Sequence, residues 1–169
     1  TRTISSAASD VYKRQGIQEF LPDKNDDNYS QQVNYLLEAV SQTIPTPVSR
    51  NFHLFGIDTT PCPRPFSATL ADKTFIHYPN PIKGNKPISI GHSYSVICAL
   101  PERIATGNVP WAVPLFAERV SSSEKATNIG NKQLEKIFNT GSFCGDKLSV
   151  LVADSFYSQR DFIGEQVKQ

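Results

Sequence analysis

The apolar residues of this chain fall into short runs separated by polar and proline-rich segments. Residues 31–42 carry apolar side chains at the i, i+3, i+4, i+7 spacing of an amphipathic helix. These positions are Val33, Leu36, Leu37 and Val40. Pro45 and Pro47 follow, and because proline cannot continue a helix, we expect the helix to end before them.

Four later runs have the composition of β-strands. We expect strands over residues 51–59, 88–100, 109–117 and 147–153. Pro61 is expected to end the first strand, and Trp111 in the third is expected to lie in the core. The fourth is an unbroken apolar run, which is typical of a central strand buried on both faces.

A helix is predicted between the third and fourth strands, over residues 131–138, with Asn131 as its N-cap. Another is expected to begin near Ser155. The order strand, strand, strand, helix, strand predicts an α/β fold with a mixed sheet. The first three strands are close enough along the chain to form an antiparallel meander, and the right-handed crossover rule places the fourth beside the first.

Two aspartates stand at the ends of the strands expected to be neighbours. Asp58 ends the first strand and Asp154 ends the fourth, so we expect them within metal-bridging distance. Two carboxylates that close repel each other unless one is protonated or a cation lies between them. Without a histidine or cysteine cluster around them, oxygen ligands favour Mg²⁺ or Mn²⁺ over zinc. The alternative is that each aspartate only caps the turn after its strand.

The connection over residues 61–87 is long and rich in proline, and connections of this length are usually functional or disordered. Ring-bearing side chains are interleaved there with basic ones, against a single acid, Asp72. The ring-bearing residues are Phe66, Phe75, His77 and Tyr78, and the basic ones are Arg64, Lys73, Lys83 and Lys86. Such a mixture can hold a phosphate backbone and stack on bases. An ordered loop with a solvated charged face is the alternative.

Composition places limits on these interpretations. The chain has 169 residues, of which 38% are hydrophobic, and no apolar run approaches the ~20 residues of a membrane span. The cysteines at 62, 98 and 144 are far apart and form no zinc spacing, so we expect reduced core thiols. The net charge of +1 does not indicate nucleic-acid binding, which would have to arise from local charge distribution.

The first fifteen residues have a different character. Residues 5–15, S-S-A-A-S-D-V-Y-K-R-Q, back-translate into a sequence that resembles the adapter ligated onto DNA fragments for sequencing. We therefore expect residues 1–15 to be non-native and the native sequence to begin near Gly16. Without them the chain holds 14 basic and 15 acidic residues.

Four stretches of the chain resemble the catalytic domain of DDE transposases from bacterial insertion sequences. They are F-G-I-D-T-T-P at 55–61, I-K-G-N-K-P-I-S-I-G-H-S-Y-S at 82–95, W-A-V-P-L at 111–115 and V-L-V-A-D-S-F-Y-S at 150–158. The resemblance implies a ribonuclease-H-like fold and metal-dependent nuclease and strand-transfer activity with two Mg²⁺ or Mn²⁺ ions. Asp58 matches the family's first catalytic aspartate, and Asp154 matches its second.

The resemblance also implies partners and a location. DNA would be the substrate, as transposon ends and target, and the intact protein would be a homo-oligomer in the bacterial cytoplasm, bound to the nucleoid and not to a membrane. The candidate DNA contacts are Arg64, Lys73, Lys83, Lys86, His92, Tyr157 and Arg160. A structural role is the alternative for His92, and solvated loop charges are the alternative for the basic residues of the connection.

One part of the family's pattern is missing. Its third acid, a glutamate on a later helix, is expected beyond Gln169, and Glu165 is too close to Asp154 to replace it. We therefore expect residues 16–47 to lead into the front part of a catalytic domain over 48–169, truncated at its C-terminus and inactive alone. A phosphatase with an aspartyl nucleophile would need an acid where Thr60 stands. A non-catalytic remnant that binds DNA or a partner is the second rival.

Overall fold

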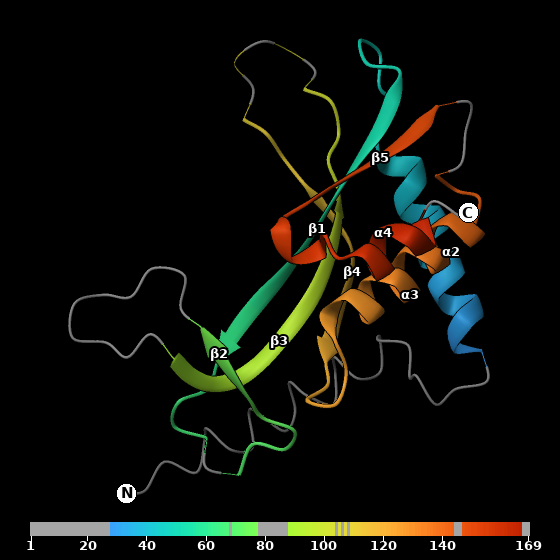
Figure 1. The fold of residues 1–169 in the computed structure, drawn as a ribbon. Helices are drawn as coiled ribbons and strands as arrows, with labels where there is room; N and C mark the ends of the chain where they lie inside the picture. Colours follow the sequence, from blue (N-terminus) through green and yellow to red (C-terminus); the bar gives the residue numbers. More distant parts are fainter. Residues whose placement is uncertain are drawn as a thin grey trace, which may run out of the picture.

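The computed structural model describes residues 28–67, 69–77, 88–103, 105, 107, 109–143 and 147–166. Its helices are α2 (Tyr29–Thr43), α3 (Ala126–Asn139) and α4 (Arg160–Gln166), with a short 3₁₀ turn η1 (Ser155–Tyr157) (Figure 1). Its strands are β1 (Phe52–Pro63), β2 (Thr74–His77), β3 (Ile88–Ala99), β4 (Val113–Val120) and β5 (Leu148–Ala153).

The strands form one mixed sheet with β1 and β3 at its centre. β1 pairs antiparallel with β3 and parallel with β5. β3 pairs in addition with β4 over residues 93–99 and with β2 over residues 88–91, both antiparallel. The fold class is therefore confirmed as an α/β, ribonuclease-H-like mixed sheet flanked by helices, with the last strand beside the first.

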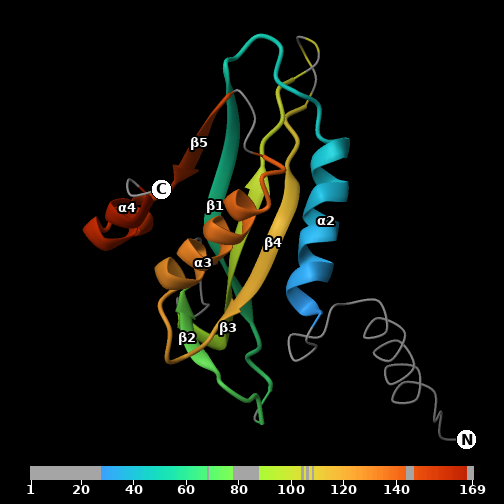
Figure 2. The same cartoon turned by 90° about the vertical axis from the view of Figure 1, so that its right-hand side faces the viewer.

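The three helices lie on one side of the twisted sheet in Figure 1, and residues of all three join one core cluster with Phe55 and Ile57. Figure 2 looks from that side, with α3 in front of the strands, α2 to the right and α4 to the left. Because side chains alternate along a strand, every second residue of β1 faces these helices. Phe55 and Ile57 are buried in this way against Leu134 and Ile137 of α3. Each such side chain contributes roughly 1.5–3 kcal/mol when it is removed from water. Asp58, one residue further along β1, points to the opposite face.

β1 continues past Pro61, contrary to the prediction that this proline ends it. The Leu100 N–H donates to the Leu54 carbonyl and the Arg64 N–H to the Ile90 carbonyl, so even-numbered residues of β1 bond to β3. The nitrogen of Pro61 therefore points away from β3, toward the edge that β5 no longer occupies. Proline is tolerated at such an edge, since no ladder hydrogen bond is lost.

Other expectations need correction. α3 begins at Ala126, five residues before the predicted cap Asn131, which lies inside the helix. β4 begins at Val113, so Trp111 precedes the strand and is 42% exposed instead of lying in the core. β2 is a strand within the segment predicted to be a loop. No residue of β5 is fully buried, contrary to the prediction of a strand buried on both faces: Ser149, Val150 and Leu151 are half-buried, and Leu148, Val152 and Ala153 are exposed.

Candidate active site

The two aspartates predicted to meet do lie side by side. β1 and β5 are parallel and in register up to the pair Ile57 and Ala153. Asp58 and Asp154 are the next residue on each chain. Neighbouring strands lie about 4.8 Å apart, and residues in register on parallel strands face the same side of a sheet. The topology therefore places the two aspartates at neighbouring positions, at the ends of β1 and β5.

Each carboxylate is oriented by a local hydrogen bond. The amide N–H of Thr59 donates to Oδ1 of Asp58 at 2.7 Å, and that of Phe156 donates to Oδ1 of Asp154 at 3.0 Å. Asp154 is thus the N-cap of η1. Asp154 therefore has the capping role that was considered as an alternative. In both aspartates the local hydrogen bond uses Oδ1, and Oδ2 has no partner among the described residues.

Both aspartates line one open groove of about 640 Å³. Its other walls come from β1, β3, β5 and the segment before β4: Gly56, Ile57, Thr60, Val96, Cys98, Leu100, Ala112, Val152 and Ala153. The oxygen donors of the groove suit a hard cation such as Mg²⁺ or Mn²⁺. Burial raises the pKa of the Cys98 thiol, so at neutral pH it stays protonated and is a poor metal ligand.

A third acid does not join the pair within the described part of the chain, where no group of three or more potential metal ligands occurs. Glu165 accepts a hydrogen bond from Nδ2 of Asn131 at 3.0 Å and lines a separate polar hollow beside α3. This agrees with the prediction that Glu165 does not complete the site.

The predicted DNA contacts are placed in different parts of the molecule. Arg64, Lys73 and His92 lie at the β2 end of the sheet, where Nε2 of His92 is 2.9 Å from the carbonyl oxygen of Ala71. This bond fits the structural alternative for His92. Arg160 is exposed at the first residue of α4. Lys83 and Lys86 fall outside the described residues.

Tyr157 is buried, with only 2% of its surface exposed, which does not fit a contact to DNA. Its hydroxyl shares a hydrogen bond with Oγ1 of Thr59 at 2.9 Å. Its ring also packs against Phe162 of α4. Tyr157 therefore joins the turn after Asp154 to the strand that carries Asp58, and holds the two halves of the site together. No local sequence pattern could reveal this role, because the contact joins residues far apart in the chain.

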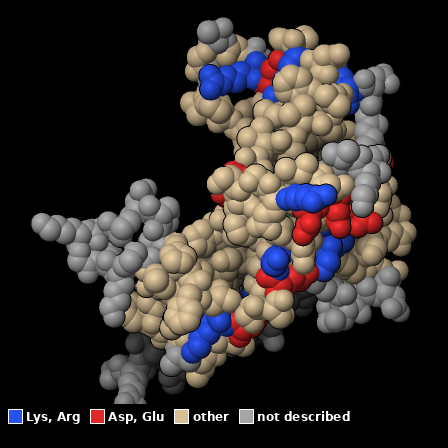
Figure 3. Space-filling model, viewed as in Figure 1, with Lys and Arg blue, Asp and Glu red and all other residues tan. Residues whose placement is uncertain are grey.

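Charge does not gather into one basic surface on the face drawn in Figure 3, where acidic and basic side chains are interspersed among uncharged ones. None of the helices in the described part combines the length and hydrophobicity needed to cross a lipid bilayer.

Compared with models of known families, the chain matches the model described as DDE superfamily endonuclease over residues 2–169. No curated protein and no solved structure matches it. The matched range begins inside the segment attributed to an adapter, so that attribution stays a prediction.

Proposed function

Because this chain belongs to the family of DDE superfamily endonucleases, we propose that it carries the catalytic chemistry of a transposase and that its cation ligands include Asp58 and Asp154. The observation that carries the proposal is the parallel register of β1 and β5. This register supports the proposal because it brings two aspartates from distant parts of the sequence to the lining of one groove.

The chemistry is phosphodiester cleavage followed by strand transfer. Bound Mg²⁺ or Mn²⁺ ions would activate the attacking oxygen and stabilise the leaving oxygen of an in-line displacement. Asp58 and Asp154 would hold these ions, while the amides of Thr59 and Phe156 each donate to Oδ1 and so orient the two carboxylates. In the first step water attacks the phosphorus of a phosphodiester and displaces the 3′-oxygen of the transposon end, which leaves as a free 3′-hydroxyl. In the joining step that 3′-hydroxyl attacks a phosphodiester of the target DNA and displaces the target's own 3′-oxygen.

In this proposal the substrate is DNA, both the transposon ends and the target. The protein acts as a homo-oligomer in the bacterial cytoplasm, bound to the nucleoid. Arg64, Lys73 and Arg160 hold phosphates, with Lys83 and Lys86 adding charge. A third carboxylate would complete such a site, and the described residues place none beside Asp58 and Asp154.

Cation binding is the direct test. We expect the chain to bind Mn²⁺. Either Asp58→Asn or Asp154→Asn should lower the Mn²⁺ affinity at least about tenfold, because the loss of even an outer-shell partner of a metal ligand lowers metal affinity about 10- to 100-fold. Asparagine retains an oxygen that can accept the local amide hydrogen bond. Asp161→Asn, an exposed aspartate in the first turn of α4, is the matched control and should change nothing.

The rival reading, a non-catalytic remnant that binds DNA or a partner, predicts a different result. Mn²⁺ affinity would then be equal in the unchanged chain, Asp58→Asn and Asp161→Asn. Titration followed by the electron paramagnetic resonance of free Mn²⁺ distinguishes the two, and equal affinities would refute the cation site.

A further inference from the structure

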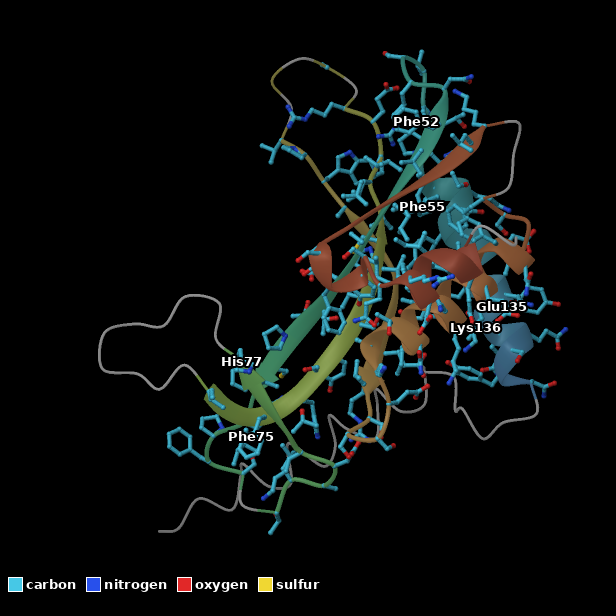
Figure 4. The ribbon with its side chains drawn as sticks, in the orientation of Figure 1. Phe52, Phe55, Phe75, His77, Glu135 and Lys136 are labelled. Atoms are coloured by element: carbon cyan, nitrogen blue, oxygen red, sulfur yellow. The ribbon has the colours of Figure 1, made fainter. Side chains whose placement is uncertain are left out.

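A second hollow meets the groove at Asp58. It has a volume of about 440 Å³ and is lined by Asp58, Thr59, Pro61, Phe75, Ile76, His77 and Ser93. Asp58 thus belongs to both hollows, so anything bound in the second lies beside the expected cation site. Figure 4 labels Phe75 and His77 on β2, at the end of the sheet away from Phe52.

The strand register places both β2 side chains on the face that carries Asp58. Asp58 pairs with Val96, and Phe75 pairs with Ile90. Val96 and Ile90 are an even number of residues apart on β3, so they and their partners face the same side. His77 follows Phe75 by two residues and shares that side.

Phe75 is unusual for a strand residue because 78% of its surface is exposed. Its neighbour Ile76 is buried, so the strand is anchored on one face while it presents an aromatic ring on the other. Asp72 fixes the start of this segment: Oδ1 accepts the Ser122 N–H at 2.9 Å, and Oδ2 lies 3.1 Å from Nη2 of Arg119. The ring of Phe75 is therefore displayed by a held element and not by a free loop.

We propose that Phe75 and His77 form a nucleotide subsite next to the cation site, in which an unpaired base stacks on Phe75 and His77 donates a hydrogen bond to an adjacent phosphate. The inference rests on the proposed function, because that function makes DNA the occupant. An exposed aromatic ring suits an unpaired base, since every base has a π-face. In a closed duplex the faces are already stacked, so the subsite selects a single-stranded end beside the bond to be cut.

The test uses a single-stranded oligonucleotide carrying 2-aminopurine, whose fluorescence is quenched by stacking, titrated with the chain in EDTA. We expect Phe75→Ala to weaken binding about 5- to 150-fold and to abolish the quenching, while Phe75→Trp retains both. His77→Ala should weaken binding about 12- to 150-fold, the range for a hydrogen bond to a charged group. A closed duplex should show no dependence on Phe75.

Phe66 provides the matched control. It is 98% exposed in the same connection but does not line either hollow. Phe66→Ala should bind within about twofold of the unchanged chain, as expected for a surface position away from any special feature. Equal losses in Phe66→Ala and Phe75→Ala, or no loss in Phe75→Ala, would overturn the subsite. Because the assay contains EDTA, its outcome is independent of the Mn²⁺ titration, and either proposal can fail alone.

Discussion

Ser95 and Gln133 form a buried polar pair that joins β3 to α3. Both side chains are fully buried. The Ser95 hydroxyl donates to Oε1 of Gln133 at 2.8 Å, and Nε2 of Gln133 donates to the Ser95 carbonyl at 3.2 Å. The pair fixes the rotation of α3 over the sheet, and α3 in turn covers the underside of the strand that carries Asp58.

Removing one partner leaves the other without its hydrogen bond. Ser95→Ala leaves Oε1 of Gln133 buried without a donor, and we expect a loss of about 1–3 kcal/mol in the free energy of unfolding, measured with urea. Combining it with Gln133→Met should recover much of this loss, because both polar groups are then replaced. The exposed Ser67→Ala should stay within about 0.5 kcal/mol. A similar change in both serine variants would contradict the role of the pair.

α3 packs closely against β1 at Gly130. A Cβ there would lie 2.7 Å from Cδ1 of Ile57 and 3.3 Å from the ring of Tyr157. Gly130→Ala therefore forces overpacking that costs about 1–3 kcal/mol, against about 1 kcal/mol gained in helix propensity. We expect a net loss near 1 kcal/mol and a displacement of Ile57, the neighbour of Asp58.

Gly164 in α4 is the control for this effect. A Cβ at Gly164 would meet nothing within 4 Å. Gly164→Ala should therefore show the helix-propensity gain alone, about 0.5–1 kcal/mol of added stability. Thermal unfolding of the two variants checks both signs, and stabilisation by Gly130→Ala would show that the contact with Ile57 relaxes freely.

Glu102 connects the segment after β3 to the segment that leads into β1. Its carboxylate accepts the amide N–H groups of Val48, Ser49 and Arg50 at 2.6, 2.9 and 3.0 Å. The hydrogen bonds from Ser49 and then Val48 are the main causes that lower the pKa of Glu102 below its usual value. A carboxylate with a lowered folded-state pKa adds stability above the unfolded-state pKa and loses it as pH falls through the folded-state pKa.

We therefore expect Glu102→Gln to lower the melting temperature at neutral pH, with the difference from the unchanged chain shrinking as the medium is acidified below the usual glutamate pKa. Melting curves across this pH range provide the measurement. Glu135→Gln, an exposed position on α3, should show no such pH-dependent difference. A difference that persists in acid would mean that Glu102 acts through packing and not through its charge.

Local sequence patterns predicted the bounds of some elements well. They were less accurate where the pairing of one strand with another determines where a strand ends or which side chains are exposed. α2, β3 and β5 begin and end within two residues of their expected positions, because each is set apart along the chain by the polar or proline-containing segments beside it. The length of β1 and the exposure of Trp111 depend on which edge a neighbouring strand occupies. The residues of one segment do not indicate where that neighbouring strand will lie. The proximity of Asp58 and Asp154 could be predicted from the sequence, because the right-handed crossover rule places the strand that ends at Asp154 beside the strand that carries Asp58.

The sheet face that carries the groove has exposed apolar side chains in the described part of the molecule. On β5, Leu148 is 70% exposed and Val152 is 52% exposed, and both face this side. β5 pairs with β1 alone among the described strands, so its outer edge can accept another strand. Exposed apolar surface beside an open strand edge favours association between molecules.

We expect the chain to self-associate with rising concentration, and the double variant Leu148→Lys, Val152→Lys to reduce this, because charge on an edge strand opposes pairing. Sedimentation velocity over a concentration series measures it. Val109→Lys, at an exposed apolar position in the connection between β3 and β4, should behave like the unchanged chain. If the unchanged chain, the double variant and Val109→Lys self-associate equally, the contact between molecules does not involve Leu148 and Val152.

The parallel pairing of β1 with β5 also sets an order of events during synthesis. A growing chain exposes Asp58 early, but its partner Asp154 follows only after β2, β3, β4 and α3 have been made. Long-range parallel pairing forms late, since the intervening chain must first be ordered. A ribosome-bound chain that has not yet released β5 therefore holds only one carboxylate of the pair, and the proposed cation site can form only when the crossover closes.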